Sequence, residues 1–168
     1  QSFTPEKISS MDEEDLTEFI GKLWAMRLWG NKEKKVAKFI EDNGLQSLRS
    51  KLADLIWSDG RIEDRWDNFR ASIKGFGPAM MSELLCMTHP KYYMVWNRRA
   101  YVAFDYLGVE DIPRYNYQHD GEKYAEMLRV RLGTRLPVYI PQRIDDSLIK
   151  IFSDFKEKAS KIGIKQFV

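Results

Sequence analysis

A short glycine-containing turn between two amphipathic segments restricts the fold of this chain more than any other feature. The turn reads Lys74-Gly75-Phe76-Gly77-Pro78. Glycine permits a positive φ in a tight turn, and proline suits the first position of the helix that follows. Apolar residues stand at helical spacing on both sides: Trp66, Phe69 and Ile73 before the turn, and Met80, Met81, Leu84 and Leu85 after it. The sequence therefore predicts two helices, 62–73 and 78–88, joined by a tight corner.

The rest of the chain shows the same helical periodicity, apart from a short extended piece expected at 136–140. The first helix is expected to begin at a capping box around Ser10 and to run to Gly30. Further helices are expected to end at Asn43 and to cover 45–56, 98–107, 121–131 and 145–163. The predicted fold is a single all-α domain, 1–168, in which the helix 145–163 either belongs to the domain or is a linker.

The composition is that of an ordinary globular domain. The chain has 168 residues, of which 43% are hydrophobic and 31% are charged, enough for one domain with a sizeable core. Apolar runs are too short to cross a bilayer, and a signal-peptide pattern is lacking, so we expect a cytoplasmic protein. Cys86 is the one cysteine, and His89 and His119 are isolated in the sequence. We therefore expect no disulfide, no metal site and no cofactor.

Charge gives only a weak indication of a partner. The net charge is +2, which does not by itself indicate a nucleic-acid-binding protein. Residues 1–20 carry six acidic side chains against Lys7, whereas residues 114–168 carry eleven Lys or Arg against seven Asp or Glu. Solvated helix faces explain this distribution, and so does one basic side on a nearly neutral domain.

Two helices joined by a Gly-x-Gly turn form the sequence pattern of a helix-hairpin-helix motif, here with its core at 62–107. In that motif the backbone N–H groups of the turn face a phosphate of a nucleic acid. A glycine corner that serves geometry alone, surrounded by solvated cations, is the alternative. The candidate DNA-backbone-binding residues are Lys74, Gly75, Phe76, Gly77, Pro78, Ala79, Arg98 and Arg99.

The same stretch resembles the helix-hairpin-helix base-excision DNA glycosylases. In that family a Pro-containing loop after the second helix leads to an Asp that caps the next helix and is the catalytic carboxylate. Asn97 stands at that place here, and Ala79 stands where bifunctional members carry a Lys. An oxocarbenium-like sugar needs a nearby negative charge and a Schiff base needs an amine. The resemblance therefore implies a hairpin that keeps its hold on double-stranded DNA without the family's chemistry.

Residues 16–97 together look like a helical module at the front of McrB-type restriction motors. The specific pieces are KGFGPA at 74–79 and PKYYMVWN at 90–97. This resemblance implies a DNA-reading domain that recognises modified or distinctive bases, joined to an AAA+ GTPase motor and a nuclease subunit. A GxxxxGK(S/T) nucleotide-binding motif is lacking, so the motor itself is not expected within this chain.

Aromatic residues after the second helix of the corner are candidates for contact with a base. Nucleobases stack on such rings, and an extruded base could be held among them. Anchoring of the loop in the core is an equally good interpretation. The candidate base-contacting residues are Tyr92, Tyr93, Trp96 and Asn97, and Tyr115 and Tyr117 form a second, weaker candidate.

Two other functions fit the sequence. The first is a divergent DNA glycosylase that uses another carboxylate, such as Asp105 or Asp120. The second is a helical protein-interaction domain in which the hairpin is only a corner.

Overall fold

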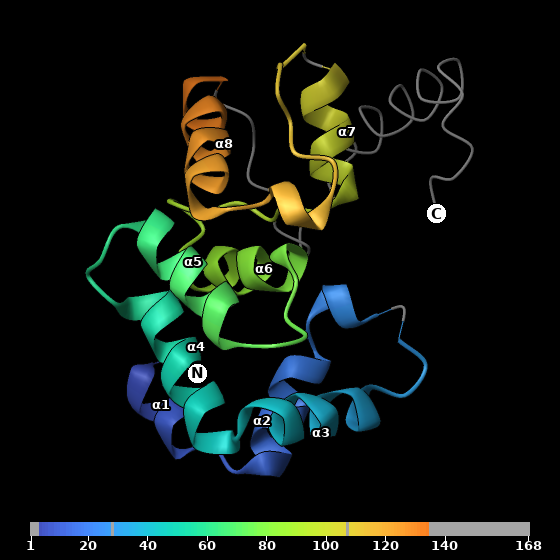
Figure 1. Ribbon diagram of the computed structural model, residues 1–168, viewed down its shortest axis with the longest axis vertical. Helices are drawn as coiled ribbons and strands as arrows, with labels where there is room; N and C mark the ends of the chain where they lie inside the picture. Colours follow the sequence, from blue (N-terminus) through green and yellow to red (C-terminus); the bar gives the residue numbers. More distant parts are fainter. Residues whose placement is uncertain (1–3, 28, 107, 135–168) are drawn as a thin grey trace. The chain divides into compact units, whose positions relative to one another are not determined.

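The computed structural model describes residues 4–27, 29–106 and 108–134, all within one compact unit that the contacts assign to Gln1–Val138 (Figure 1). These residues form helices and connecting segments, which confirms the predicted all-α class for the described part of the chain. None of these helices combines the length and the apolar character that crossing a lipid bilayer requires. The helices are α1 Pro5–Ser10, α2 Glu13–Gly21, η1 Trp24–Met26 (3₁₀), α3 Lys32–Asn43, α4 Leu45–Trp57, α5 Ile62–Ser72, α6 Pro78–Thr88, α7 Arg98–Tyr106, η2 Asn116–Gln118 (3₁₀) and α8 Gly121–Thr134.

Helix α6 is the centre of this unit. In Figure 1 it lies between α1–α4 on one side and α7 and α8 on the other. A helix that is apolar around most of its circumference must be enclosed by other elements, and α6 contacts both η1 and α4. Its buried residues are Pro78, Met80, Met81, Ser82, Glu83, Leu84, Leu85 and Cys86. The second helix of the predicted corner is therefore part of the core; Ala79 near its start is partly exposed, and Met87 near its end is exposed.

Helices α5 and α8 pack unusually close together. The Trp66 and Tyr124 rings stack with centroids 4.2 Å apart. A Cβ added to Gly121 would lie 2.1 Å from the carbonyl oxygen of Glu63, so only glycine fits at this contact. The Gly121 N–H donates to the Asp67 carboxylate at 2.8 Å. The first residue of α8 is thus held directly against the backbone of α5.

The amino-terminal helices differ from the prediction. Ser10 ends the short helix α1 rather than capping the next one. Asp12 caps α2 instead, in a capping box with Asp15. The expected continuous helix to Gly30 is wrong, because α2 ends at Gly21 and a separate 3₁₀ turn follows.

The remaining predicted boundaries in the described residues agree closely with the structure. Asn97 caps α7 and Asp120 caps α8 through side-chain oxygens that accept backbone N–H groups. The segment 91–96 is irregular, as expected, whereas the predicted loop at 112–119 contains the 3₁₀ turn η2. The expected extended piece at 136–140 and helix at 145–163 lie outside the described residues.

Candidate nucleic-acid interface

The corner between α5 and α6 is fixed by its first glycine. Gly75 has φ +89°, a conformation that side chains disfavour. A Cβ at this position would also lie 2.7 Å from the Phe39 ring of α3. The Asn43 side chain, at the end of α3, accepts from the Lys74 N–H at 2.7 Å and donates to the Lys74 carbonyl at 3.0 Å. The corner is therefore held against α3 by packing and by two hydrogen bonds.

The second glycine of the corner has a different role. Gly77 is the N-cap of α6 with φ −93°, so the positive φ of the turn is supplied by Gly75 and not by this glycine. A Cβ on Gly77 would meet nothing within 4 Å. Among the described residues, no side chain caps this helix start, and the N–H of Ala79 has no acceptor. Backbone groups at the start of α6 are thus open to an outside acceptor.

The two apolar side chains of the corner serve the core. Phe76 is buried, with its ring 5.0 Å from Phe39 and 5.7 Å from Phe69. Pro78 is buried as well. Since neither side chain reaches the surface, the predicted contribution of these two residues to binding is limited to their backbone, whereas Lys74 and Gly75 are exposed.

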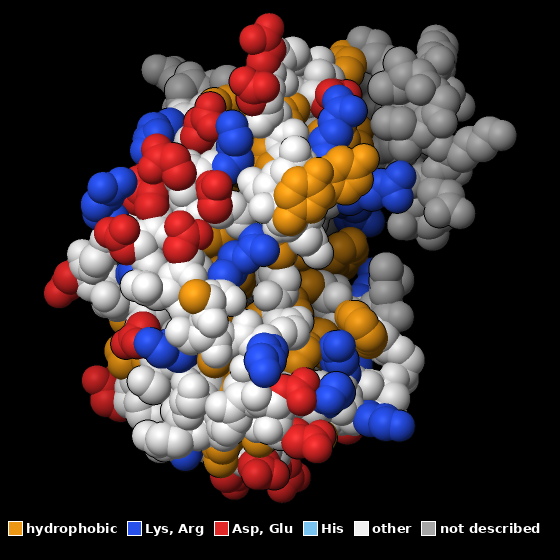
Figure 2. Space-filling model, viewed as in Figure 1, with side chains coloured by type: hydrophobic (Ala, Val, Ile, Leu, Met, Phe, Trp, Pro, Cys, Tyr) orange, Lys and Arg blue, Asp and Glu red, His pale blue; other side chains and the backbone are white. Residues whose placement is uncertain are grey.

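The two predicted cations that follow the second helix of the corner stand at the start of α7. Arg98 is exposed at the start of α7, and the guanidinium of its neighbour Arg99 lies 4.6 Å from the Trp24 ring centre of η1. Figure 2 shows Lys and Arg together with Asp and Glu near the corner and α3, and a larger group of Asp and Glu with interspersed Lys and Arg over α5 and α8.

Lys35 is a further cation beside the corner that the sequence analysis did not identify. Its Nζ lies 4.3 Å from the Trp29 ring centre and 5.1 Å from that of Phe39, the same ring that contacts Gly75 and Phe76. Lys35 could have been identified from the sequence, because it stands four residues before Phe39 and the two side chains therefore lie on one face of α3.

The predicted base-contacting residues have different environments. Trp96 is buried: its Nε1–H donates to His119 Nε2 at 3.0 Å and its backbone N–H donates to Ser82 Oγ at 2.7 Å. No face of the Trp96 ring is left exposed for stacking, so its predicted contact with a base is wrong. Tyr93 is half-buried, and its hydroxyl accepts from Arg65, which fits the alternative of loop anchoring. Tyr92 is 67% exposed.

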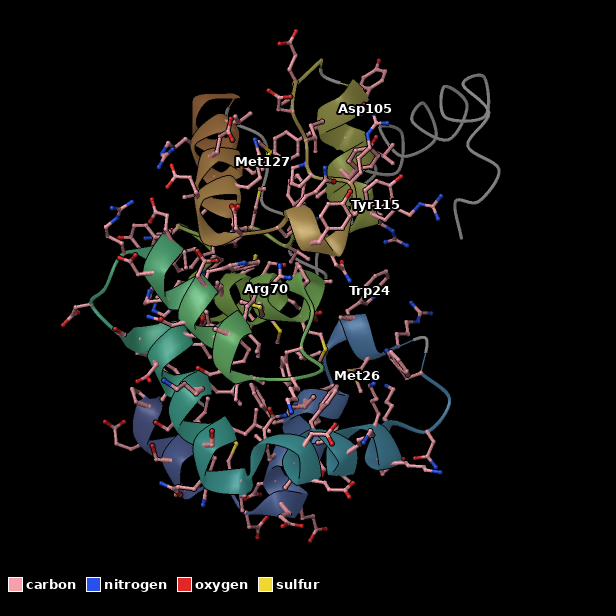
Figure 3. All side chains as sticks on the ribbon, viewed as in Figure 1. Trp24, Met26, Arg70, Asp105, Tyr115 and Met127 are labelled. Atoms are coloured by element: carbon pink, nitrogen blue, oxygen red, sulfur yellow. The ribbon has the colours of Figure 1, made fainter. Side chains whose placement is uncertain are left out.

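Asn97 is occupied by its role as a helix cap. Its Oδ1 accepts from the N–H groups of Arg99 at 2.9 Å and Ala100 at 3.2 Å. The two carboxylates considered for glycosylase chemistry are engaged elsewhere. Asp105 lies at the opposite end of α7 (Figure 3), within 3.5 Å of Arg114. Asp120 caps α8. The corner therefore gains no carboxylate from either residue.

The buried carboxylate of Glu83 stabilises the turn η1. Its two oxygens accept from the backbone N–H groups of Trp24 and Ala25, at 2.5 and 2.9 Å. Burial raises the pKa of Glu83 above 4.5, although the two backbone N–H groups oppose this effect. Glu83 thereby joins the centre of α6 to the segment that carries Trp24.

We expect Glu83→Ala to destabilise the fold by about 2 kcal/mol, because two N–H groups lose their acceptor. Glu83→Gln keeps one acceptor and should cost less. Because the folded pKa is raised, the Glu83 carboxyl contributes stability that is lost as pH rises from 4.5 through that pKa, and Glu83→Gln should lack this contribution. Urea unfolding of the three proteins at about pH 5 and pH 8 measures both effects. Equal stability of the alanine variant and the wild type would contradict this role.

The groove between α2 and α3 has the wrong charge for a phosphate. It encloses about 320 Å³, and its charged lining consists of three glutamates and one lysine. Within the described residues, no cluster of His, Cys, Asp and Glu is arranged to hold a metal ion. The corner between α5 and α6 is therefore the better candidate interface for an anionic partner.

Comparisons with protein-family models, with curated proteins and with solved structures gave no match to this chain.

Proposed function

We propose that this chain binds double-stranded DNA, with a phosphate seated against the backbone at the start of α6. The observation that carries the proposal is Gly77: neither its φ nor its packing requires glycine, and open space lies where a side chain would be. The N–H groups at a helix N-terminus attract phosphate, and only a residue without a side chain lets the phosphate approach the backbone closely.

The exposed cationic side chains support the same surface as the DNA-binding site. Lys74 and Arg98 are exposed, and Lys35 lies on the α3 side of the corner. Arginine and lysine contacts to phosphates position a protein on the duplex without reading its sequence. The resemblance of residues 16–97 to the front of McrB-type motors supports a specific setting for this binding. In that setting the chain reads modified or distinctive bases for an AAA+ GTPase motor and a nuclease subunit, and it catalyses no reaction itself.

Gly77→Ala is the sharpest test, because the structure predicts that it leaves the free protein almost unchanged. Alanine is a poorer N-cap than glycine, so we expect a stability loss of about 0.5 kcal/mol. DNA affinity should fall roughly tenfold, since the methyl group blocks the phosphate. Fluorescence anisotropy with a short labelled duplex measures this affinity. An unchanged affinity would contradict a phosphate seated at this helix start.

Charge reversals test the cations around the corner. We expect Lys74→Glu and Arg98→Glu each to weaken binding of any duplex and to reduce the slope of log affinity against log salt by about 1. Lys51→Glu, on α4 and paired with Asp54 at 3.7 Å, changes the net charge equally and serves as the control. Affinity that is flat between about 50 and 200 mM salt would contradict the proposal. So would equal effects of all three reversals.

Two further measurements separate the proposed setting from its alternatives. Duplexes that differ only in base methylation or hydroxymethylation should differ in affinity if the chain reads modified bases. Incubation with damaged-base duplexes followed by alkali should leave the strands intact, whereas cleavage at the lesion would indicate a glycosylase. If Lys74→Glu and Arg98→Glu leave DNA binding unchanged, a protein-interaction domain becomes the better interpretation.

A further inference from the structure

Two exposed tyrosines form a stacked pair on the turn η2. The ring planes of Tyr115 and Tyr117 are inclined by only 4°, with centroids 5.7 Å apart. The residues are 60% and 78% exposed. In Figure 2 a hydrophobic patch stands out on the surface where Figure 3 labels Tyr115. Aromatic rings of this size normally contribute to a core, and an exposed parallel pair is therefore a candidate for binding a planar ligand.

The pair is held in place by its backbone. The Gln118 side chain accepts from the N–H groups of Arg114 and Tyr115, at 2.9 and 3.0 Å. From α5, Arg70 donates to the carbonyl of Asn116 at 2.9 Å and also to the carbonyl of His119. A ring platform that is already ordered loses little entropy when a ligand stacks on it.

Arg114, which directly precedes Tyr115 in the chain, carries a positive charge. The Arg114 guanidinium is 5.4 Å from the Tyr101 ring centre and 3.5 Å from the Asp105 carboxylate, and its side chain is 62% exposed. A guanidinium and a pair of stacked aromatic rings on one short segment match the two parts of a nucleotide, its phosphate and its base. A neutral sugar ring has no anionic group that could pair with this guanidinium.

The platform is connected to the corner through the core. His119, which follows η2, accepts from Trp96, and the Trp96 backbone donates to Ser82 of α6. Figure 1 shows η2 on the side of α6 where the corner enters this helix. A duplex whose backbone contacts the corner therefore lies near the tyrosines.

We propose that Tyr115 and Tyr117 form a stacking platform for an unpaired base of the bound DNA, with Arg114 facing its phosphate. This inference rests on the proposed function for the identity of the ligand. Every base has a π-face, so such a platform selects a base because it is unpaired and not for its identity. The more exposed ring, Tyr117, supplies the outer face on which the base stacks.

The test compares a fully paired duplex with the same duplex carrying one unpaired 2-aminopurine. We expect the wild type to bind the second duplex roughly tenfold tighter and to quench its fluorescence. Tyr117→Ala should lose this preference and the quenching but bind the paired duplex as the wild type does. Tyr117→Phe keeps the ring and should retain both. Because Tyr117 is exposed, all variants should have the thermal unfolding midpoint of the wild type.

Failure of the inference and failure of the proposed function give different results. Tight binding of the paired duplex, with no Tyr117-dependent preference for the unpaired base, would overturn the platform and leave the proposed function standing. Binding of a single-stranded oligonucleotide that depends on Tyr117, without binding of the paired duplex, would overturn the proposed function and support the platform. No binding of any probe would overturn both.

Discussion

Gly121→Ala should destabilise the fold by about 3 kcal/mol, because its methyl group would overlap the backbone of α5. The added Cβ would lie 2.1 Å from the carbonyl oxygen and 2.6 Å from the Cα of Glu63. Neither atom belongs to a side chain that could rotate away, so α8 would have to move as a whole. That movement would lengthen the 2.8 Å hydrogen bond to Asp67 and disturb the Trp66–Tyr124 stack. Urea unfolding measures the loss.

Two other glycines provide matched controls for this substitution. Gly108→Ala should cost only about 1 kcal/mol, because φ +74° is strained for alanine but nothing lies within 4 Å. Gly77→Ala, without either penalty, should stay close to the wild type. If Gly121→Ala resembles Gly77→Ala in stability, α5 and α8 do not approach as closely as the structure describes.

His119 should make the stability of this protein strongly dependent on pH. Burial lowers the pKa of His119 from 6.5 to about 4, with a further lowering by Arg70 and an opposing effect of Asp120. The unfolded chain therefore takes up a proton between pH 6.5 and about 4 that the folded chain does not. The contribution of His119 to stability should be constant above this window and fall by roughly 3 kcal/mol across it as the pH drops.

Two variants separate the charge of His119 from its hydrogen bond. His119→Gln keeps an acceptor for the Trp96 Nε1–H and does not titrate, so this part of the pH dependence should disappear. His119→Leu leaves the buried Trp96 N–H without an acceptor and should cost about 2 kcal/mol at neutral pH. Urea unfolding of wild type and variants across the window measures both effects. A wild type and a His119→Gln variant with parallel pH profiles would contradict the role of His119.

The features that sequence predicted well are governed by local chemistry. The position of the corner in the chain, the caps Asn97 and Asp120, and the limits of α6 are indicated by residues within a few positions of one another. A glycine turn followed by proline is one such signal, and a polar side chain that caps a helix start is another. Both act on residues only a few positions away. Such signals can therefore be read without knowledge of the fold.

The features that sequence missed depend on partners far along the chain. Nothing near Gly21 indicates that α2 ends there, because the 3₁₀ turn that follows is stabilised by Glu83, 58 and 59 residues away. Trp96 is buried, and its Nε1–H finds its acceptor in His119, 23 residues later. Aromatic residues in a loop can face the core or the solvent, and local spacing does not distinguish the two.

The same limit applies to the two glycines of the corner. Gly75 and Gly77 look equivalent in the sequence, yet one has a positive φ and contacts Phe39, while the other has an ordinary backbone and open space. Only the position of α3 separates these roles. The Lys35 side chain was missed for the same reason, since its place beside the corner follows from the packing of Phe39.

The two hydrogen bonds between Asn43 and Lys74 have a consequence for the kinetics of association. Both polar groups of the Lys74 backbone are engaged before any partner arrives, and the neighbouring Gly75 is locked against Phe39. A duplex would therefore meet a rigid docking point, and no folding step would follow the encounter. Diffusion, orientation and long-range attraction by the surrounding cations would then set the association rate.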